Sequence, residues 1–352
     1  MRIADLETPV PVIDLDKVEH NLAKMQSYCD RHGLSFRPHI KTHKIPAFAH
    51  RQVELGAHGI TCQKLGEAEV MVDAGLGDIL ISYPLIGSAK ALRLAELARR
   101  AQLRVACDST SAVDTVGEAA LAAKSPIGIL VEFDSGNRRT GVETVDQALE
   151  LALHVGKNPG LSFDGLMTYP STEATALFVA EARDRFARCG IEIAIVSGGG
   201  TPNAWEAHHI AGLTEVRAGT YIYHDRATVG AGAASLEECA LHVHATVVSR
   251  PTEDRAVIDA GSKSLSSDQV SPSVGPGYGL IRGYESAVIE RLNEEHGVID
   301  LSRCNHKPVV GERIQILPNH VCVVSNLHDE VAVSRGGELI DMWRVAARGK
   351  TR

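Results

Sequence analysis

The chain of 352 residues is long enough for a barrel plus a second domain. Its composition, with 44% hydrophobic and 23% charged residues, is typical of a soluble globular protein. A formal net charge of -8 argues against nucleic acid as the main partner. No apolar run approaches the roughly 20 residues that span a membrane, and the N-terminus lacks the features of a signal peptide. Seven scattered cysteines without a C-x-x-C motif predict reduced thiols in a cytoplasmic protein.

Short apolar runs alternate with amphipathic stretches from residue 34 to about residue 221. The stretches SAKALRLAELARRA and TVDQALELALHVG, for example, carry apolar residues at helical spacing. Eight β-then-α units predict an α/β domain over residues 11–228, folded as a closed parallel (β/α)8 TIM-type barrel. Because periodicity does not detect closure, an open doubly wound sheet is the alternative. The expected strands lie in LSFRPHIK, GITCQ, DILISYPL, LRVACDS, PIGILVEFDS, LSFDGLMTYP, IEIAIVSGGG and LTEVRAGTY.

The character of the sequence changes after residue 228, where helical periodicity fades. β-like runs separated by turn residues predict a smaller, mostly β domain over residues 229–352, which we expect to include residues 1–10. We interpret His242 and His244, in the first of these runs, as ordinary strand residues. The runs are ALHVHATVVS, RAVIDAGSK, ERIQIL and VCVVSNL.

The segment RPHIKTHK concentrates five basic side chains within an acidic chain. In a strand, alternation puts Arg37, His39 and Lys41 on one face, at the strand end where barrel enzymes carry their functional groups. Neighbouring cations lower the pKa of an amine, so this arrangement favours a reactive lysine at position 41. The alternative is a solvated basic turn, as most charge runs are.

Two further polar segments follow barrel strands, namely DSGNRRTG after the fifth and SGGGTP after the seventh. The three glycines of SGGGTP let backbone N–H groups approach an anion. Thr201 fits the N-cap of a following helix and Pro202 its first position, so the helix dipole faces the loop. The pattern favours a phosphate cradle over a merely flexible turn, and it is neither G-x-G-x-x-G nor a Walker loop.

A lysine at one strand end and a phosphate cradle at another suggest pyridoxal phosphate, an aldehyde that a lysine binds as a Schiff base. Tyr169, at the end of the sixth run, either contacts this cofactor or only caps the barrel wall. In PNHVC, a strand would point His320 and Cys322 to the same face about 6.5 Å apart. These two side chains can share Zn²⁺ or a similar ion, although two ordinary core residues give the same pattern.

Taken together, the motifs resemble the D-threonine aldolase and D-serine dehydratase group within the alanine racemase-like pyridoxal enzymes. The resemblance spans nearly the whole chain and implies an N-terminal barrel, a C-terminal β domain and a homodimer with active sites between subunits. The motifs that carry it are RPHIKTHK, GITCQKLGEAEV, DSGNRRTG, SGGGTP, EVRAGTYIYHD, LNEEHG, PNHVC and the closing WRVAARG.

The resemblance implies roles for residues at both ends of the cofactor. Lys41 resembles the Schiff-base lysine, with Lys44 as the second choice. Tyr221 resembles a tyrosine that reaches the phosphate. The residues that resemble the phosphate loop are Ser197, Gly198, Gly199 and Gly200, followed by Thr201.

The resemblance also implies residues around the cofactor ring and at a metal. Arg139 matches the arginine of D-x-G-x-x-R-x-G near the ring, and Gln63 belongs to a string that lines it. Arg217 matches an arginine that faces the pyridine nitrogen in the racemases. His320 and Cys322 resemble the metal ligands, and the cysteine favours Zn²⁺ over Mn²⁺ or Mg²⁺.

The family divides at this metal pair, because His-x-Cys looks like the zinc pair of the dehydratases while some aldolases carry His-x-Asp. We favour an aldolase that cleaves a small β-hydroxy-D-amino acid to glycine and an aldehyde. The alternative is a D-serine or 3-hydroxy-D-aspartate dehydratase, which releases a 2-oxo acid and ammonia from the same parts. An amino-acid racemase and a non-catalytic pyridoxal phosphate carrier are further alternatives, and neither needs the metal pair.

Overall fold

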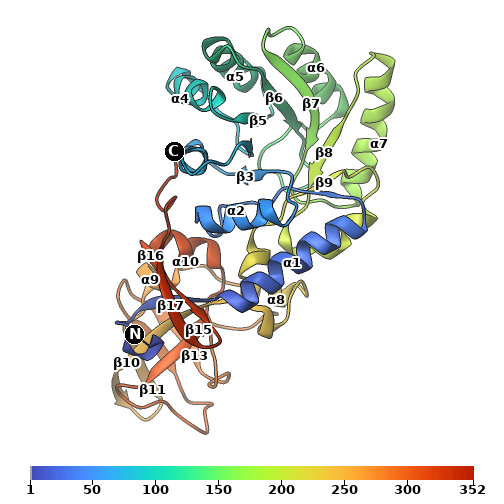
Figure 1. The fold of residues 1–352 in the computed structure, drawn as a ribbon. Helices are drawn as coiled ribbons and strands as arrows, with labels where there is room; N and C mark the ends of the chain where they lie inside the picture. The colour runs from blue at the N-terminus through green and yellow to red at the C-terminus, as the bar shows by residue number, and fades with distance from the viewer. Residues whose placement is uncertain (1) are drawn as a thin grey trace. The chain divides into compact units, whose positions relative to one another are not determined.

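The computed structural model describes residues 2–352 and divides the chain into two compact units. The polypeptide passes between the units more than once, so neither is a single continuous segment; Figure 1 shows the path from the blue N-terminus to the red C-terminus. The first unit comprises residues up to Lys24, Thr42–Ile45 and Thr220–Gly349. The second comprises Met25–Lys41, Pro46–Gly219 and Lys350–Arg352.

An eight-stranded parallel sheet forms the centre of the second unit. Its strand order is β2-β9-β8-β7-β6-β5-β4-β3, and a parallel bridge between His39 and Thr61 joins the segment after β2 to β3. The ring of strands is therefore closed, which confirms the predicted barrel. Each of the eight predicted runs supplies one strand: β2 (Ser35–Phe36), β3 (Ile60–Cys62), β4 (Asp78–Ile81), β5 (Gln102–Cys107), β6 (Ile127–Glu132), β7 (Leu161–Met167), β8 (Ile195–Gly198) and β9 (Glu215–Val216).

Amphipathic helices follow the strands, and in Figure 1 the helices α4 to α7 lie outside strands β5 to β8. The two stretches singled out in the sequence form α4 (Ser88–Ala98) and α6 (Val145–Val155), and each buries its apolar side. A capping box starts α6, because Thr144 accepts a hydrogen bond from the Gln147 amide and the Gln147 side chain accepts one from Thr144. The other helices are α2 (Pro46–Glu54), α3 (Leu65–Asp73), α5 (Thr110–Ala123) and α7 (Glu173–Arg188).

A nine-stranded mixed sheet dominates the first unit. Its strand β1 (Val10–Asp14) pairs antiparallel with β10 (Leu241–Thr252) and parallel with β16 (Glu330–Arg335). The N-terminal run TPVPVIDL thus joins the β-rich part of the chain, and helix α1 (Leu15–Arg31) follows it. The remaining strands are β11 (Arg255–Ile258), β12 (Leu280–Ile281), β13 (Val288–Leu292), β14 (Gly297–Asp300), β15 (Arg313–Leu317) and β17 (Glu338–Arg344).

One predicted strand of this region is wrong. The run VCVVSNL forms the helix α10 (Val321–Leu327), with His320 as its extended N-cap residue. His320 and Cys322 are therefore not alternate residues of one strand, as we expected, but lie at the start of a helix. The run is apolar almost throughout, so its periodicity cannot distinguish a buried strand from a short buried helix. Two other short helices, α8 (Arg226–Gly230) and α9 (Ser262–Leu265), interrupt the strands.

Both units are built around apolar interiors. In the barrel, Leu80, Ala106, Leu130 and Met167 come from four neighbouring strands and form one buried cluster. Among the described residues 2–352, no helix combines the length and apolarity that crossing a membrane requires.

Candidate active site

The basic segment Arg37–Lys44 is buried rather than solvated. Arg37 and His43 have no exposed surface, and His39 and Lys44 are 8% and 6% exposed. Lys41 is half-buried. A solvated basic turn, the alternative for this segment, is therefore wrong, because four of the five basic side chains are buried. Burying a charged or polar group has an energetic cost that its partners must offset.

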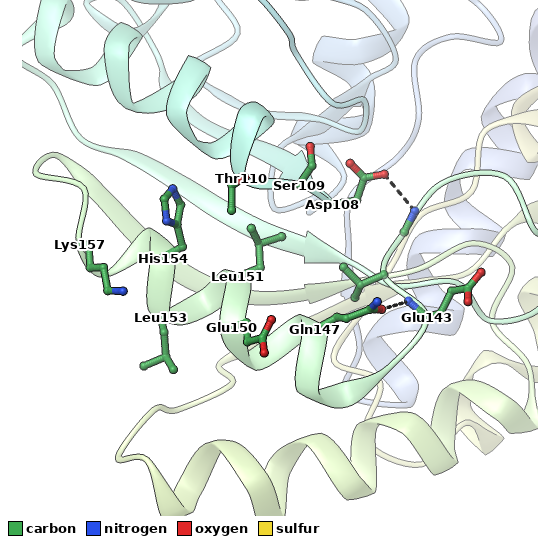
Figure 2. Close-up of a pocket in the computed structure, with 12 residues that line it drawn as sticks. Asp108, Ser109, Thr110, Glu143, Gln147, Glu150, Leu151, Leu153, His154 and Lys157 are labelled. Carbon is green, nitrogen blue, oxygen red and sulfur yellow. Dashed lines mark hydrogen bonds between the residues drawn. The ribbon is translucent and has the colours of Figure 1, made fainter.

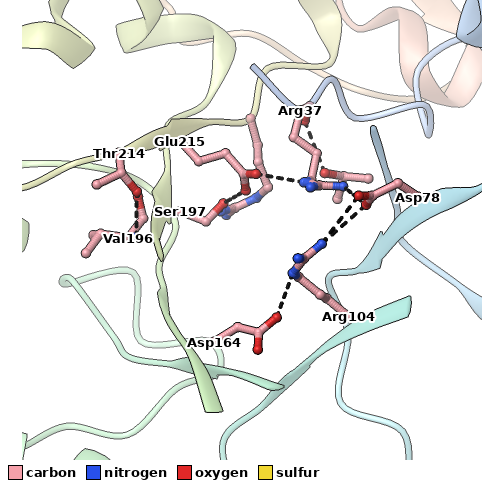
Figure 3. A network of polar contacts seen from close by, with 10 residues as sticks. Arg37, Asp78, Arg104, Asp164, Val196, Ser197, Thr214 and Glu215 are labelled. Carbon is pink, nitrogen blue, oxygen red and sulfur yellow. Dashed lines mark hydrogen bonds and ion pairs between the residues drawn. The ribbon is translucent and has the colours of Figure 1, made fainter. Parts of the chain in front are cut away.

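The partners of Arg37 are two carboxylates. Its Nε donates to Glu215 Oε2 at 2.7 Å and its Nη1 donates to Asp78 Oδ1 at 2.5 Å (Figure 3). Burial lowers the pKa of Arg37, but the two carboxylates outweigh burial and raise it. Arg37 stays charged and paired, so it does not serve as the uncompensated cation that its place in the basic run suggested.

The same network reaches the glycine-rich loop. The Ser197 hydroxyl donates to Glu215 Oε1 at 2.5 Å and accepts from Arg217 Nη1 at 2.7 Å, and Figure 3 shows Ser197 beside Glu215. Arg217 also donates from Nη2 to the Thr168 carbonyl at 2.8 Å. Burial lowers the pKa of Arg217 to about 10, against the opposing effects of Glu215 and Glu132. Because the Ser197 hydroxyl is already engaged, phosphate binding by this loop would rest on its backbone.

His39 connects the predicted lysine to Gln63. The Lys41 amide donates to His39 Nδ1 at 3.4 Å, and His39 Nε2 lies 3.0 Å from Gln63 Oε1. Since Nδ1 accepts, the proton of the neutral ring sits on Nε2 and is donated to Gln63. Gln63 is held in turn by a bond from its Nε2 to the Ser82 carbonyl at 3.2 Å. One imidazole thus links the Lys41 backbone to the Gln63 side chain.

The glycine-rich loop is tight because neighbouring side chains leave no room for a Cβ. A Cβ on Gly198 would lie 2.2 Å from Ser171 Oγ, and one on Gly200 would lie 2.8 Å from the Tyr169 ring. Gly200 also has φ +146°, which side chains rarely adopt. The Gly199 amide donates to Ser171 Oγ at 2.5 Å. The Gly199 amide is thus engaged by Ser171, so an anion at this loop would have to be held by its other backbone groups.

The helix after this loop differs from the prediction. Gly200, rather than Thr201, is the N-cap, and no side chain caps it. The helix is a 3-10 helix, η2 (Thr201–His209), with a kink at Asn203. Loop geometry, with Gly199 and Gly200 both at positive φ, moves the helix start one residue earlier than the Thr-Pro pattern suggested. The dipole of this short, kinked helix contributes less to anion binding than that of a regular α-helix.

Arg139 and Tyr169 lie beside the loop. The guanidinium carbon of Arg139 is 5.2 Å from the centre of the Tyr169 ring, a distance at which a cation and an aromatic face attract. Because the same ring contacts the Gly200 position, Arg139, Tyr169 and Gly200 form one cluster at the barrel rim. Both side chains are exposed, so each has the freedom to contact a ligand.

A cavity of about 530 Å³ lies nearby in the second unit, between the start of α5 and the side of α6. Figure 2 shows Asp108, Ser109 and Thr110 on one side and Gln147 and Glu150 on the other. None of the predicted site residues lines it. Gly141, the last residue of DSGNRRTG, lines the cavity and donates from its amide to Asp108 Oδ2 at 3.1 Å. Because the residues predicted to hold the cofactor are absent from the lining, we do not assign the cofactor to this cavity.

The predicted metal pair lies in the first unit, where Asp225 orients the histidine. Asp225 is fully buried, and its Oδ2 lies 2.9 Å from His320 Nδ1 and accepts from the Val321 amide at 3.2 Å. Burial lowers the pKa of His320, but the hydrogen bonds with Asp225 and Cys322 outweigh burial and raise it to about 11. A carboxylate on one ring nitrogen leaves Nε2 for a metal ion.

Cys322 completes the pair. Its thiol lies 3.1 Å from Thr42 Oγ1 and 3.9 Å from Thr220 Oγ1, and it is partly exposed. Within residues 2–352, no group of three or more His, Cys, Asp and Glu side chains is arranged to hold a metal ion. An imidazole and a thiol supported by a buried carboxylate fit an ion that takes its other ligands from water or substrate. Tyr221, the remaining predicted residue, is buried in the 3-10 helix η3 (Thr220–Ile222) of this unit.

Three supporting residues were not predicted from the sequence, namely Asp225, Glu215 and Thr42. Two of them stand in EVRAGTYIYHD, the string that also supplied Arg217 and Tyr221. Thr42 stands between the basic residues of RPHIKTHK. These residues could have been suspected, because their carboxylates and hydroxyl lie within motifs that the sequence had already marked. Nothing in the motifs indicated which side chains they would contact.

The family model described as alanine racemase, N-terminal domain, matches residues 13–227. The chain belongs to this alanine racemase-like family. A second model, described as a putative serine dehydratase domain, matches residues 240–334. The expected family is thereby confirmed, and with it the expected class: the chain is an enzyme, a pyridoxal-phosphate-dependent lyase.

Relatives of known activity match nearly the whole chain. A D-threonine aldolase of Arthrobacter sp is 36% identical over 99% of this chain and 95% of its own length. A D-threo-3-hydroxyaspartate dehydratase of Delftia sp. (strain HT23) is 31% identical over 90% of this chain and 91% of its own. The crystal structure of D-threonine aldolase from Filomicrobium marinum superimposes with a TM-score of 0.91 at 34% identity, covering 100% of this chain and 98% of that one.

Proposed function

We propose that the chain is a D-threonine aldolase, which cleaves β-hydroxy-D-amino acids to glycine and an aldehyde. The observation that carries this proposal is the full-length similarity to two D-threonine aldolases, one at 36% identity and one with a TM-score of 0.91. A 3-hydroxy-D-aspartate aldolase of Paracoccus denitrificans (strain Pd 1222), 30% identical over 99% of this chain, supports retro-aldol chemistry on the same substrate class. The resemblance further supports a homodimer.

The proposed cofactor is pyridoxal phosphate, which supplies an electron sink for bond cleavage at the α carbon when it is bound. Lys41 would hold the aldehyde covalently, with its backbone fixed by His39. The backbone of Gly198 to Thr201 would hold the phosphate, together with Tyr221. Around the ring we propose Gln63, Arg139, Tyr169 and Arg217, with Ser197 positioning the last of these through its 2.7 Å hydrogen bond.

A divalent metal on His320 and Cys322 is part of the proposal, and it would supply a Lewis acid for the β-hydroxyl of the substrate. Asp225 would keep His320 Nδ1 occupied and its Nε2 directed at the ion. Solved structures of a D-threo-3-hydroxyaspartate dehydratase include a histidine-to-alanine variant and a cysteine-to-alanine variant, the latter in a metal-free form. The metal-free form of the cysteine variant supports a metal in this group of enzymes.

A dehydratase is the second candidate, favoured by the His-x-Cys pair and by the match of residues 240–334 to the serine dehydratase model. The two reactions use the side chains differently. In the aldolase, a base accepts the proton of the β-hydroxyl as the bond between the α and β carbons breaks. In the dehydratase, Lys41 takes the proton of the α carbon, and hydroxide leaves from the β carbon.

Product analysis separates the candidates. The purified protein, loaded with pyridoxal phosphate and Zn²⁺ or Mn²⁺, is incubated with D-threonine, with L-threonine as the stereochemical control. Acetaldehyde and glycine in equal amounts are the expected products. If 2-oxobutyrate and ammonia form instead, the enzyme is a dehydratase and the aldolase proposal is wrong. L-allo-threonine appearing as the reaction proceeds would instead indicate a racemase, which inverts only the α carbon, and no product at all would favour the non-catalytic carrier.

A further inference from the structure

A second polar cavity, of about 480 Å³, lies in the first unit against the sheet formed by β1, β10 and β15. None of the residues proposed for the cofactor or the metal lines it. Its volume falls within the range of about 300–1,000 Å³ that is usual for small-molecule sites. We propose that this cavity binds a small, multiply charged anion that carries phosphate or carboxylate groups.

Two histidines of β10 face this cavity. Strand alternation directs His242 and His244 to one side of the sheet, while Val243 and Ala245 point to the fully buried core on the other. The histidines are 8% and 7% exposed, and His242 Nε2 and His244 Nδ1 are buried without a hydrogen-bond partner. An unsatisfied buried polar atom costs about 1–3 kcal/mol, so packing alone does not account for imidazoles where valines would serve.

The charge around these histidines is predominantly positive. Lys17, Arg282 and Arg313 line the cavity, and none of them has a carboxylate within ion-pair distance among the described residues. Lys17 donates to the Cys239 carbonyl at 3.2 Å, and Arg313 donates to the carbonyls of two residues near the N-terminus, Ile3 and Leu6. Carbonyl partners satisfy hydrogen bonds without cancelling charge. This excess of unneutralised cations stands out in a chain with a net charge of -8.

The other charged residues of the lining do not reverse this balance. Arg2 is a fourth cation, which Asp5 pairs at 2.9 Å. The acidic members are Asp14 and Glu338. Asp14 accepts bonds from the backbone amides of Asp16 and of Lys17, which hold its carboxylate without cancelling its charge. The lining therefore carries four cations, Arg2, Lys17, Arg282 and Arg313, against these two carboxylates.

The cations also determine which ion the site favours. Burial, together with Arg282 and Lys17, lowers the pKa of His242 to about 3, and burial together with Arg313 lowers that of His244 to about 4. Both rings are therefore neutral at pH 7, and each has one N–H to donate. The surrounding positive charge repels a metal ion and attracts an anion. An anion in the cavity would neutralise the cations and draw protons onto the imidazoles, so binding should be coupled to proton uptake.

Calorimetry on the full chain loaded with pyridoxal phosphate tests this proposal, because the loaded cofactor keeps phosphate out of its own loop. Inorganic phosphate and citrate are titrated separately in an amine buffer at pH 6.5, with glucose as the uncharged control. Saturable binding of one anion per chain is expected. The affinities of phosphate and citrate then distinguish a phosphate ligand from a carboxylate ligand. The Arg282→Gln variant should bind at least tenfold more weakly, while Arg255→Gln, which changes an exposed arginine of β11 outside the cavity, should bind normally.

The number of protons taken up on binding is a second measurement. If the histidines had a purely structural role, replacing them would not change this number. The titration is repeated in two buffers of different ionisation enthalpy, and the His242→Phe variant should take up fewer protons than the unaltered chain. Heat that does not saturate, or equal affinity in Arg282→Gln and the unaltered chain, would mean an adventitious ion only. The proposal is also wrong if neither anion binds the unaltered chain and Arg282→Gln changes its oligomeric state. That result would mean that a second copy of the chain covers this face.

Discussion

The buried carboxylate of Asp225 holds His320 through a 2.9 Å contact between Oδ2 and Nδ1, although the two residues are 95 positions apart in the chain. The same oxygen accepts from the Val321 amide at 3.2 Å, so the start of α10 and the imidazole are fixed together. A histidine held in this way presents one defined nitrogen to a ligand.

Replacing Asp225 by asparagine should therefore weaken metal binding about 10- to 100-fold, the usual effect of removing a carboxylate behind a ligating histidine. The asparagine retains an oxygen for the Thr228 amide that Asp225 now caps at 2.8 Å, so the fold should survive. Zn²⁺ titration against a chromogenic chelator measures the affinity. Asp300→Asn is the matched control, since Asp300 is a carboxylate of the same unit outside the metal pair. If Asp225→Asn and the unaltered chain bind Zn²⁺ with equal affinity, Asp225 does not support the metal site.

Lys41→Ala should abolish both the visible absorption of bound pyridoxal phosphate and turnover of D-threonine, because no other amine would hold the aldehyde. Lys44 is the control, since it is buried and its Nζ lies 3.5 Å from the Ala347 carbonyl. Lys44→Arg keeps the charge and should keep the absorption band. A band that persists in Lys41→Ala and vanishes in Lys44→Arg would move the covalent attachment to Lys44.

The barrel was predictable because each buried parallel strand is a short apolar run and each helix carries an apolar stripe. The run VCVVSNL was predicted wrongly because a short, nearly continuous apolar run fits a buried strand as well as a short buried helix, and only tertiary packing makes it the helix α10. The glycine-rich loop was recognised from its amino-acid sequence, SGGGTP. Its N-cap was misplaced by one residue because the positive φ of Gly199 and Gly200 is not encoded in a Thr-Pro pattern.

Pairings between distant residues were beyond the reach of sequence patterns. Arg37 binds Glu215 and Asp78, which are 178 and 41 residues away, and no local spacing indicates either contact. The basic segment was therefore recognised as unusual, but the reason that it tolerates burial came only from the structure. The same holds for His242 and His244, which follow the strand pattern and yet face a cavity.

The Gly200→Ala variant should lose affinity for pyridoxal phosphate, because its Cβ would lie 2.8 Å from the Tyr169 ring and would displace the ring or the loop. Gly190→Ala is the matched control: Gly190 also has positive φ, at +70°, but nothing lies within 4 Å of its Cβ position. Fluorescence titration of the apoenzyme with pyridoxal phosphate gives the dissociation constants. If the clash is the cause, Gly200→Ala should cost less affinity in a Tyr169→Ala background than in the unaltered chain, because the ring is then absent. An equal cost in both backgrounds would assign the loss to backbone strain instead.

Arg37→Met should lower the free energy of unfolding by about 3–5 kcal/mol, since it leaves the buried carboxylate of Glu215 and the half-buried carboxylate of Asp78 without their shared cation. Arg99→Met breaks an exposed ion pair with Glu96 and should cost at most about 1 kcal/mol. Urea denaturation at pH 7 compares the two variants. Similar losses in both would show that the Arg37 network contributes little to the stability of the barrel.

Acid should destabilise the folded chain partly through His224, which is 2% exposed. Burial lowers the pKa of His224 to about 4, against opposing effects of Glu238 and Asp225. Because the folded pKa is below the ordinary value of about 6.5, the unfolded chain binds a proton first as the pH falls, and stability is lost between about pH 6.5 and about pH 4. At pH 5.5 this loss amounts to about 1 kcal/mol.

The His224→Asn variant isolates this contribution, because asparagine tolerates the positive φ of 49° at this position and does not titrate. The free energy of unfolding is measured in urea at pH 8 and at pH 5.5, where carboxylates of ordinary pKa remain ionised, in a buffer without phosphate or citrate. The decrease between the two pH values should be about 1 kcal/mol smaller in the variant than in the unaltered chain. Comparing each protein with itself removes the packing cost of the substitution. Equal decreases would mean that His224 takes up its proton in the folded chain as readily as in the unfolded one.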